Sequence, residues 1–208
     1  MRQLQKVRQF FEDLVAQYGV DARSANWSGP ATQAARYAVF RAYLDLKDCR
    51  VLDVGCGQGD LYAYLQEHQV PIQTYHGWDL APNMIAVARR RFPELKDNFR
   101  ERDLFSAAQE TGSFDWVLCS GSLNYGYDQA SFQEAVRVMF RLARKGVAFN
   151  VLSTYADFME EEYFYARPEE TFSFCRTITP WVNLIHSYMP HDFTMILKKE
   201  RDDYLSQT

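Results

Sequence analysis

The chain has 208 residues, of which 47% are hydrophobic and 24% are charged. This length suits one domain with a core of its own, and the ordinary composition excludes disordered and fibrous proteins. The formal net charge of -4 and the pI of about 5.6 give no general attraction to phosphate backbones or anionic membranes. Nucleic acid is therefore a disfavoured substrate, and no membrane partner is expected.

The four cysteines form no CxxC pair and show no metal-ligand spacing to histidine. Neither a disulfide framework nor a metal site is expected from this arrangement. Charged residues interrupt the apolar residues between Met1 and Tyr18, unlike the core of a signal peptide or a membrane span. A cytoplasmic location is the resulting expectation.

Two helical patterns precede any strand. Apolar residues recur at helical spacing from Leu4 to Tyr18, with Gly19 placed to end the helix, and a second pattern runs from Gln33 to Leu44. The first helix is expected to bury one stripe, either as core packing or as part of a lid. We expect residues 1–48 to form a helical cap segment and residues 49–208 to form the main domain.

From Cys49 onward, strand-like and helix-like segments alternate, which predicts a parallel sheet with helices on both faces. The expected strands are residues 50–54, 72–78, 98–102, 116–119 and 147–152, and the expected helices are residues 60–67, 83–92 and 131–144, the last ended by Gly146. Two further strand-like runs, residues 182–188 and 193–198, are joined by a link too short for a parallel crossover. They should form an antiparallel hairpin at the sheet edge, with the sixth strand parallel to the others.

A glycine-rich turn follows the first expected strand, in Val51-Leu52-Asp53-Val54-Gly55-Cys56-Gly57-Gln58-Gly59. Glycine permits unusual backbone angles and places no side chain in a ligand's path, and the helix that begins near Asp60 aims its amides at the same crevice. The third glycine falls one residue earlier than in the GxGxxG pattern of dinucleotide-binding folds. A ligand site is expected here, and a nicotinamide or flavin cofactor is disfavoured.

Two acids end the next two expected strands. Asp79 closes the second strand, where a carboxylate accepts hydrogen bonds from ribose hydroxyls. Asp103 closes the third, where it can accept a hydrogen bond from an adenine amino group while Leu104 holds the ring. These positions favour a cofactor that contains adenosine.

With these residues in order, the sequence resembles the class I S-adenosylmethionine (SAM) dependent methyltransferases over residues 50–199. The first motif matches Val51 to Gly59, the ribose acid matches Asp79, the adenine-side acid matches Asp103, and the fourth-strand motif matches residues 114–120. The resemblance implies an α/β fold with a three-layer, Rossmann-like, seven-stranded, mostly parallel sheet, an antiparallel C-terminal hairpin strand and added N-terminal helices. It also implies SAM as the cofactor and S-adenosylhomocysteine (SAH) as its product.

The resemblance assigns roles around the turn. Backbone at Gly55 and Cys56 and the carbonyl of Ser120 would hold the methionine portion of SAM. The acid at Asp53 would order the turn or contact the cofactor's amino group through water, and Met84 would pack against adenine. The full expected cofactor-binding set is Trp27, Arg36, Asp53, Gly55, Cys56, Gly57, Gly59, Asp79, Leu80, Met84, Asp103, Leu104 and Ser120.

Upstream segments in related methyltransferases fold over the cofactor pocket, which gives Trp27 and Arg36 their expected roles. Arg36 would pair with the SAM carboxylate. The alternative is a packed tryptophan and an exposed helical arginine. The sequence leaves both open.

The methyl acceptor is less well defined. Since SAM carries an activated methyl, the protein has to align an acceptor for in-line attack, and a base is optional. Tyr125, after the fourth strand, is a candidate acceptor contact, and His191, in the hairpin turn, is the candidate base. The aromatic residues between Tyr155 and Tyr165 either cap a small pocket or pack on the sheet.

The expected activity is methyl transfer to a small molecule such as a sugar, a natural product or an aromatic metabolite. A protein partner is left open. The alternative is a non-catalytic or partner-dependent module of the same fold that binds SAM or SAH, and an NAD-dependent oxidoreductase is a weaker third.

Overall fold

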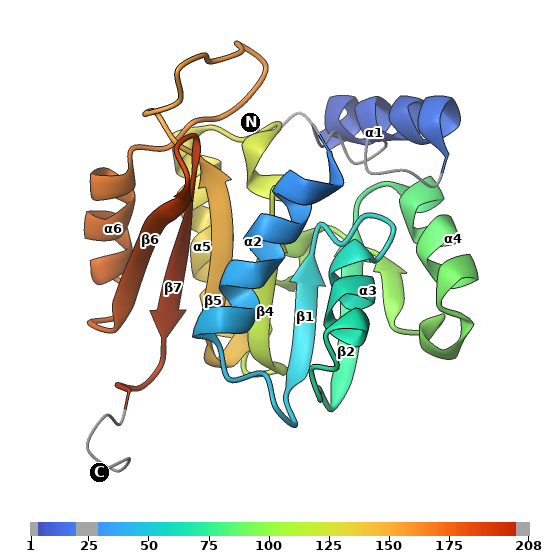
Figure 1. Ribbon diagram of the computed structural model, residues 1–208, viewed down its shortest axis with the longest axis horizontal. Helices are drawn as coiled ribbons and strands as arrows, with labels where there is room; N and C mark the ends of the chain where they lie inside the picture. The colour runs from blue at the N-terminus through green and yellow to red at the C-terminus, as the bar shows by residue number, and fades with distance from the viewer. Residues whose placement is uncertain (1–3, 20–28, 203–208) are drawn as a thin grey trace.

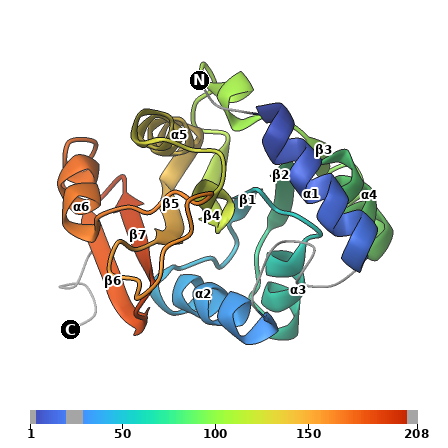
Figure 2. The same ribbon diagram turned by 90° about the horizontal axis from the view of Figure 1, so that it is seen from above.

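The computed structural model describes residues 4–19 and 29–202 and has a seven-stranded sheet at its centre (Figures 1 and 2). The strand order is β3-β2-β1-β4-β5-β7-β6. The strands are β1 (Arg50–Val54), β2 (Thr74–Asp79), β3 (Phe99–Glu101), β4 (Phe114–Ser120), β5 (Ala143–Leu152), β6 (Val182–Met189) and β7 (Asp192–Lys198). Strands β1 to β5 pair in parallel, whereas β7 lies between β5 and β6 and runs antiparallel to both. The predicted fold class, hairpin included, is confirmed.

Helices cover both faces of the sheet. Figure 2 shows α2 and α3 on one face and α5 and α6 on the other. The helices are α1 (Leu4–Tyr18), α2 (Pro30–Tyr43), α3 (Asp60–Glu67), α4 (Pro82–Arg91), α5 (Gln129–Leu142) and α6 (Pro168–Arg176), with 3-10 turns η2 (Pro93–Leu95), η3 (Leu104–Ala107) and η4 (Ser122–Asn124). None of the helices within the described residues combines the length and the apolar character that a membrane crossing requires.

A separate hydrophobic core lies on each face. On one face Phe132 of α5 packs with Phe149 of β5, and on the other Phe40 and Leu61 come from α2 and α3 to pack with Leu118 of β4. All five side chains are buried. A parallel sheet covered on both faces buries its central strands on both sides, and β1, β4 and β5 are accordingly buried over most of their length.

Gly146 does not end a helix, contrary to the prediction. Helix α5 ends at Leu142, and Gly146 lies within β5. A Cβ atom at this position would lie 2.3 Å from the carbonyl oxygen of Leu197 and 2.7 Å from the ring of Trp116. Glycine is needed here because another strand and a large ring approach the backbone closely, which is a common use of glycine inside a strand.

Helix α6 was not predicted from the sequence. Its signals were present, since Pro168 opens the helix, Glu169 and Glu170 lie in the first turn, and Arg176 lies in the last. These residues follow a long run of aromatic and acidic residues with no clear period, and that run obscured the helix start.

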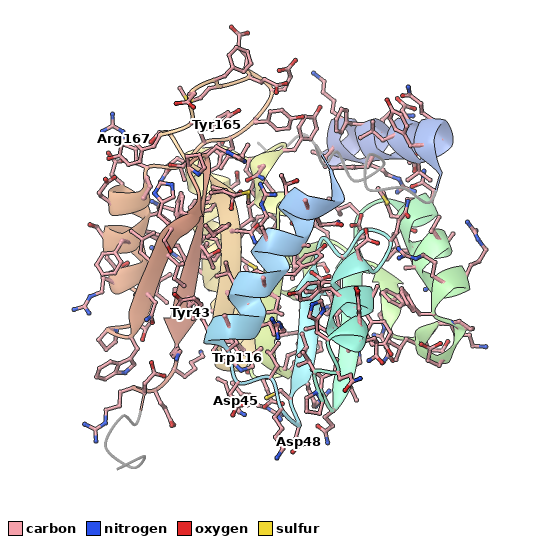
Figure 3. The ribbon with its side chains drawn as sticks, viewed as in Figure 1. Tyr43, Asp45, Asp48, Trp116, Tyr165 and Arg167 are labelled. Carbon is pink, nitrogen blue, oxygen red and sulfur yellow. The ribbon has the colours of Figure 1, made fainter. Side chains whose placement is uncertain are left out.

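The two ends of the sheet carry different connections (Figure 3). Tyr165 and Arg167 lie in the long connection at the carboxyl end of β5, at the top of the view. At the opposite end, the indole Nε1 of Trp116 donates to the carbonyl oxygen of Asp45 at 3.0 Å. Ligands of open α/β sheets bind at the carboxyl ends of the strands, so the upper end is where a site is expected.

Candidate functional site

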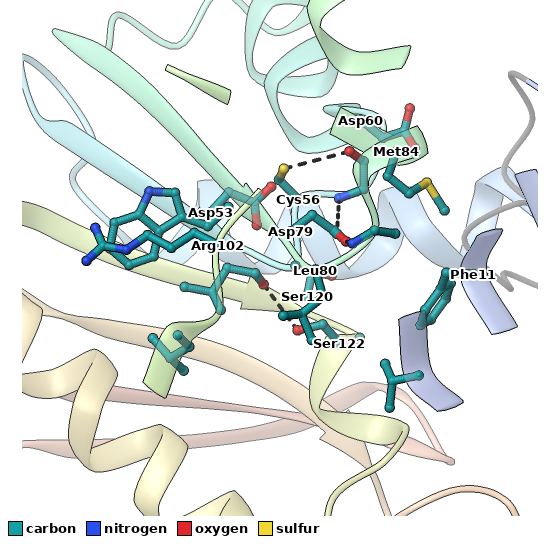
Figure 4. Close-up of a pocket in the computed structure, with 18 of the residues that line it drawn as sticks. Phe11, Asp53, Cys56, Asp60, Asp79, Leu80, Met84, Arg102, Ser120 and Ser122 are labelled. Carbon is teal, nitrogen blue, oxygen red and sulfur yellow. Dashed lines mark hydrogen bonds between the residues drawn. The ribbon is translucent and has the colours of Figure 1, made fainter. Parts of the chain in front are cut away.

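A cavity lies at the carboxyl ends of β1, β2 and β4, beneath α1 (Figures 1 and 4). It encloses about 920 Å³ of empty space, part of it open to solvent. The lining residues are Val7, Arg8, Phe11, Gln33, Tyr37, Asp53, Val54, Gly55, Cys56, Gly57, Asp60, Trp78, Asp79, Leu80, Ala81, Met84, Arg102, Leu104, Ser120, Gly121, Ser122 and Tyr127.

The glycine turn forms the floor of this cavity. Gly55 has a φ of 75°, and a Cβ atom there would lie only 2.2 Å from the Cβ of Ser122. The hydroxyl of Ser122 donates to the carbonyl oxygen of Val54 at 3.2 Å, so η4 is held directly against the turn. Gly55 is therefore required both by its backbone angle and by the close approach of the segment after β4.

The carboxylate of Asp79 is fixed by the backbone. It accepts hydrogen bonds from the amides of Gly57 and Ala81, each at 2.9 Å (Figure 4). Burial raises the pKa of Asp79, and the backbone donors partly oppose that rise. An ionised carboxylate has about four acceptor positions, so the backbone hydrogen bonds from Gly57, Ala81 and Leu80 leave capacity for a hydroxyl of a ligand.

Asp53 of β1 also lines the cavity and is 3% exposed. The hydroxyl of Tyr75 donates to its Oδ2 at 2.5 Å. The pKa of Asp53 is raised to about 7, because burial outweighs the hydrogen bond from Tyr75, and the charges of Asp79 and Asp60 add to the rise.

Cys56 is held as a protonated thiol. It is 6% exposed, and burial together with the nearby Asp79 and Asp53 raises its pKa well above the usual value. Because the thiolate is the nucleophilic form, this environment makes the side chain inert.

The side toward β3 has an apolar lining. Leu80, Met84 and Leu104 are among the cavity residues, as the cofactor prediction requires of a wall against adenine. Asp103 is not among them, and its Oδ1 accepts from the amide of Phe105 at 3.2 Å to cap η3. A contact between Asp103 and adenine stays a prediction.

Two further residues on this side were not expected from the sequence. Trp78 and Arg102 both line the cavity, and the guanidinium carbon of Arg102 lies 4.1 Å from the centre of the Trp78 ring. Arg102 also pairs with Glu110. Their positions could have predicted this, because Trp78 directly precedes Asp79 and Arg102 directly precedes Asp103.

Helix α1 lies over the cavity and contributes Val7, Arg8 and Phe11 to its lining. In Figure 4, Phe11 of α1 lies at the edge of the cavity, below Met84 in the view. Apolar periodicity had predicted the buried stripe, and the structure shows that part of that stripe faces a cavity.

Several contacts hold α1 in place. Arg8 forms an ion pair with Glu101 at 3.0 Å, and the amide nitrogen of the Asn83 side chain donates to the Glu12 carbonyl at 3.1 Å. Val7 packs against the backbone of Gly126, where a Cβ atom would lie 2.2 Å from Val7 Cγ2.

Arg36 lies in α2 and is 4% exposed. Its Nε and Nη2 contact Oδ2 of Asp192 at 2.8 and 2.7 Å, and its Nη1 donates to the carbonyl of Thr32 at 3.2 Å. The neighbours Gln33 and Tyr37 line the cavity instead. The expected contact of Arg36 with a SAM carboxylate stays a prediction, and Trp27 lies outside the described residues.

Tyr125 belongs to an aromatic cluster beside the cavity. Its ring stacks on Phe10 of α1 with centroids 4.4 Å apart, and it contacts Phe11 and Tyr163 edge-on. An isolated antiparallel bridge pairs Tyr125 with Tyr163, and the amide of Phe164 donates to the Asn124 carbonyl at 2.8 Å. The cluster joins α1 to the segments that follow β4 and β5.

The aromatic run after β5 divides into two groups. Tyr163 and Phe164 are half-buried, whereas Tyr155 and Phe158 are 58% and 77% exposed. His191 lies in the turn between β6 and β7, where its carbonyl accepts from the amide of Ser153 at 2.9 Å. It is not among the described residues that line the cavity.

The chain is similar to several known proteins. A family model described as a methyltransferase domain matches residues 51–146, which include the glycine turn, Asp79, Asp103 and β4. The ubiquinone biosynthesis O-methyltransferase of Xanthomonas oryzae pv. oryzae (strain PXO99A) is 34% identical over 119 residues, which are 56% of this chain and 47% of that protein. The demethylmenaquinone methyltransferase of Thermus thermophilus is 33% identical over 106 residues, 50% of this chain and 46% of that protein. The chain thus spans about half the length of these relatives.

The fold has close counterparts among solved structures. Magnesium protoporphyrin IX methyltransferase from Synechocystis PCC 6803, solved with bound SAM, superimposes with a TM-score of 0.68 at 18% identity, covering 96% of this chain and 98% of that one. The strand order, the antiparallel β7 and the matched motif region all agree with this likeness. Residues 51–146 thus match a methyltransferase domain, and the fold is the Rossmann-like fold of the class I SAM-dependent methyltransferases.

Proposed function

We propose that the chain binds SAM in the cavity beneath α1 and transfers its methyl group to a small-molecule acceptor. The observation that carries this proposal is the combination of Gly55, whose missing Cβ lets η4 pack against the turn, and Asp79, a half-buried carboxylate that lines the cavity at the end of β2.

The residues present fit the parts of SAM. Asp79 would accept from the ribose hydroxyls, the apolar wall of Leu80, Met84 and Leu104 would enclose the adenine, and the turn at Gly55 would carry the methionine portion. The group of carboxylates at this floor would also favour a ligand with positive charge.

When bound, SAM supplies a methyl group already activated on a sulfonium. The protein then has to hold the reacting atoms in line and keep water away, which accounts for much of the rate gain in such reactions. Phe11 and Val7 of α1 cover the cavity and would exclude water from the transfer. We propose that Tyr125 borders the approach of the acceptor. A base role for His191, which is not among the described lining residues, stays a prediction of the sequence.

A small acceptor is supported by three observations. The acidic chain has no general attraction to nucleic acid, the cavity lies within the domain beneath α1, and the relatives above are named for quinone and porphyrin substrates. The acceptor itself, whether a quinol-like, sugar or other metabolite, is not specified by these features. Action in the cytoplasm stays a prediction of the sequence.

The test is to incubate the purified chain with SAM labelled in its methyl group and with fractionated cell extract. We expect label in the small-molecule fraction, and label confined to nucleic acid would overturn the proposal. Asp79→Asn serves as the control, because loss of one carboxylate acceptor should weaken SAM binding by about 1–3 kcal/mol and reduce labelling in parallel.

A second candidate is a module that binds SAM or SAH without turnover. It is favoured by one observation: among the described lining residues there is no histidine, lysine or glutamate, and the aspartates Asp53, Asp60 and Asp79 already accept hydrogen bonds from other groups of the protein. Calorimetry separates the two candidates, because the module would bind SAM and SAH tightly yet transfer no label to any fraction.

A further inference from the structure

One buried acid in the cavity has no cationic partner. Asp53 is 3% exposed, its Oδ2 accepts from the Tyr75 hydroxyl, and no lysine, arginine or histidine of the described residues forms an ion pair or hydrogen bond with it. The side chain lines the cavity, so a bound cationic ligand would lie beside it. An isolated buried carboxylate is costly, and it reduces that cost by taking up a proton.

The neighbouring acids are compensated differently. Asp60 of α3 pairs with Arg91 at 2.6 Å and accepts from Gln33 at 3.3 Å. Asp79 accepts from two backbone amides. Asp53 is therefore the acid of this cavity whose protonation should respond most strongly to the charge of a bound ligand.

The groups that face Asp53 come from every packed element. Tyr75 and Asp79 belong to β2, Cys56 to the turn, Asp60 to α3, Tyr37 to α2 and Cys119 to β4. Burial raises the pKa of Tyr37, Tyr75, Cys56 and Cys119, which keeps these four groups neutral near pH 7. The nearest arginine of α2, Arg36, is committed to Asp192.

We propose that Asp53 carries a proton in the empty cavity and releases it when SAM binds, so that the protein distinguishes its methyl donor from the product by charge. This inference rests on the proposed function. SAM has an ammonium, a sulfonium and a carboxylate, a net charge of +1, whereas SAH lacks the sulfonium and is neutral overall. A cation in the same low-dielectric cavity favours the ionised form of Asp53.

The linkage gives a definite pH dependence. The empty protein holds Asp53 with a pKa of about 7, and bound SAM lowers that pKa, so SAM affinity should fall as the pH falls through 7. With the SAM-bound pKa well below 6, the dissociation constant for SAM should rise several-fold between pH 7.5 and pH 6.0, and binding at pH 6.5 should release most of one proton per SAM. For SAH both effects should be smaller.

Calorimetry of the whole chain with SAM, SAH and adenosine, in buffers with different ionisation enthalpies, measures affinity and proton release together. The amino group of SAM itself titrates near 8, so each value for the native protein is compared with that for Asp53→Asn at the same pH. Asparagine keeps the shape of the protonated acid. We expect the variant to lose the additional pH dependence and the proton release, and adenosine, which has no charge, to show neither in either protein.

Tyr75→Phe is a second variant, which should shift the pH dependence of SAM binding where Asp53→Asn removes it. It removes the hydrogen bond that lowers the pKa of Asp53, so the change in SAM affinity should move to higher pH. The same profile for SAM in the native protein and Asp53→Asn would overturn the inference, as would SAH with a pH dependence equal to that of SAM. Absence of SAM binding at every pH would instead overturn the proposed function.

Discussion

The two halves of the candidate site are held together in different ways. Around β1 and β2 the backbone fixes the site, since the amides of Gly57 and Ala81 bind Asp79 and the amides of Gly55 and Cys56 both donate to the Trp78 carbonyl at 2.7 and 3.1 Å. Beyond β4 and β5, side chains from separate segments hold the structure. There the Tyr125 ring meets Phe10 and Tyr163, and Arg36 meets Asp192. Where the backbone forms the site, its geometry dictates the residue type at particular positions. Where loop side chains form the site, many residue types can make equivalent contacts.

The largest effect is expected at Gly55, where the backbone-built half is most crowded. Gly55→Ala would place a methyl group 2.2 Å from the Ser122 Cβ at a φ of 75°, so we expect a loss of more than about 4 kcal/mol in unfolding free energy. Urea unfolding measures this loss, and calorimetry measures the accompanying loss of SAM binding.

Gly57→Ala is the matched control. Gly57 also has a positive φ, 52°, but nothing lies within 4 Å of the position that a methyl group would take there, so only the conformational cost of about 1 kcal/mol remains. Equal costs at the two glycines would show that backbone angle, and not the contact with Ser122, dictates glycine in this turn.

The next largest effect concerns the ion pair that joins α2 to β7. Arg36→Met leaves the carboxylate of Asp192 buried with only the hydroxyl of Tyr188 as a side-chain donor, so we expect a cost of about 3–4 kcal/mol. Adding Asp192→Asn should recover part of it. A variant that stays stable but binds SAM more than tenfold more weakly would instead support the cofactor role expected from the sequence.

The same contrast explains which parts of the fold and of the candidate site could be predicted from the sequence. The turn from Gly55 to Gly59 and the acid Asp79 are required by backbone geometry, so they stand at fixed places after β1 and β2 and predicted both the site and the fold. The pairing of Arg36 with Asp192 joins residues 156 positions apart, and no local pattern encodes it. Gly146 was misread for a related reason, because its role depends on β7, which lies far along the chain.

Disturbing the contact between Val7 of α1 and Gly126 should have an intermediate effect on stability and on SAM dissociation. Gly126→Ala would bring a methyl group 2.2 Å from Val7 Cγ2 at a φ of 73°, so we expect α1 to shift, with about 2–3 kcal/mol lost and faster SAM dissociation in stopped-flow measurements. The second substitution Val7→Ala should restore slow dissociation. Gly112→Ala, at a φ of 56° but with its nearest neighbour 3.8 Å away, should leave dissociation unchanged.

A smaller effect, with a distinctive pH dependence, is expected from Asp53. Its pKa is about 7 in the folded protein and about 3.9 in an unfolded chain. The folded state therefore binds more protons between these values, and its stability falls as the pH rises from about 4 to 7. Asp53→Asn should remove this fall and gain about 1–3 kcal/mol at pH 8 in the ligand-free protein. A native protein equally stable at pH 5 and pH 8 relative to the variant would contradict the assignment.

The smallest effect is expected in the side-chain-built half, at His191. A general base usually contributes between a hundredfold and ten-thousandfold in rate, and it has to reach the acceptor directly or through one water. His191 lies at the hairpin turn outside the described cavity lining, so His191→Ala should lower kcat/KM by less than about tenfold once an acceptor is in hand. A loss of a hundredfold or more with unchanged SAM affinity would identify His191 as the base. It would also place the acceptor beside the β6–β7 turn, extending the site beyond the described cavity lining.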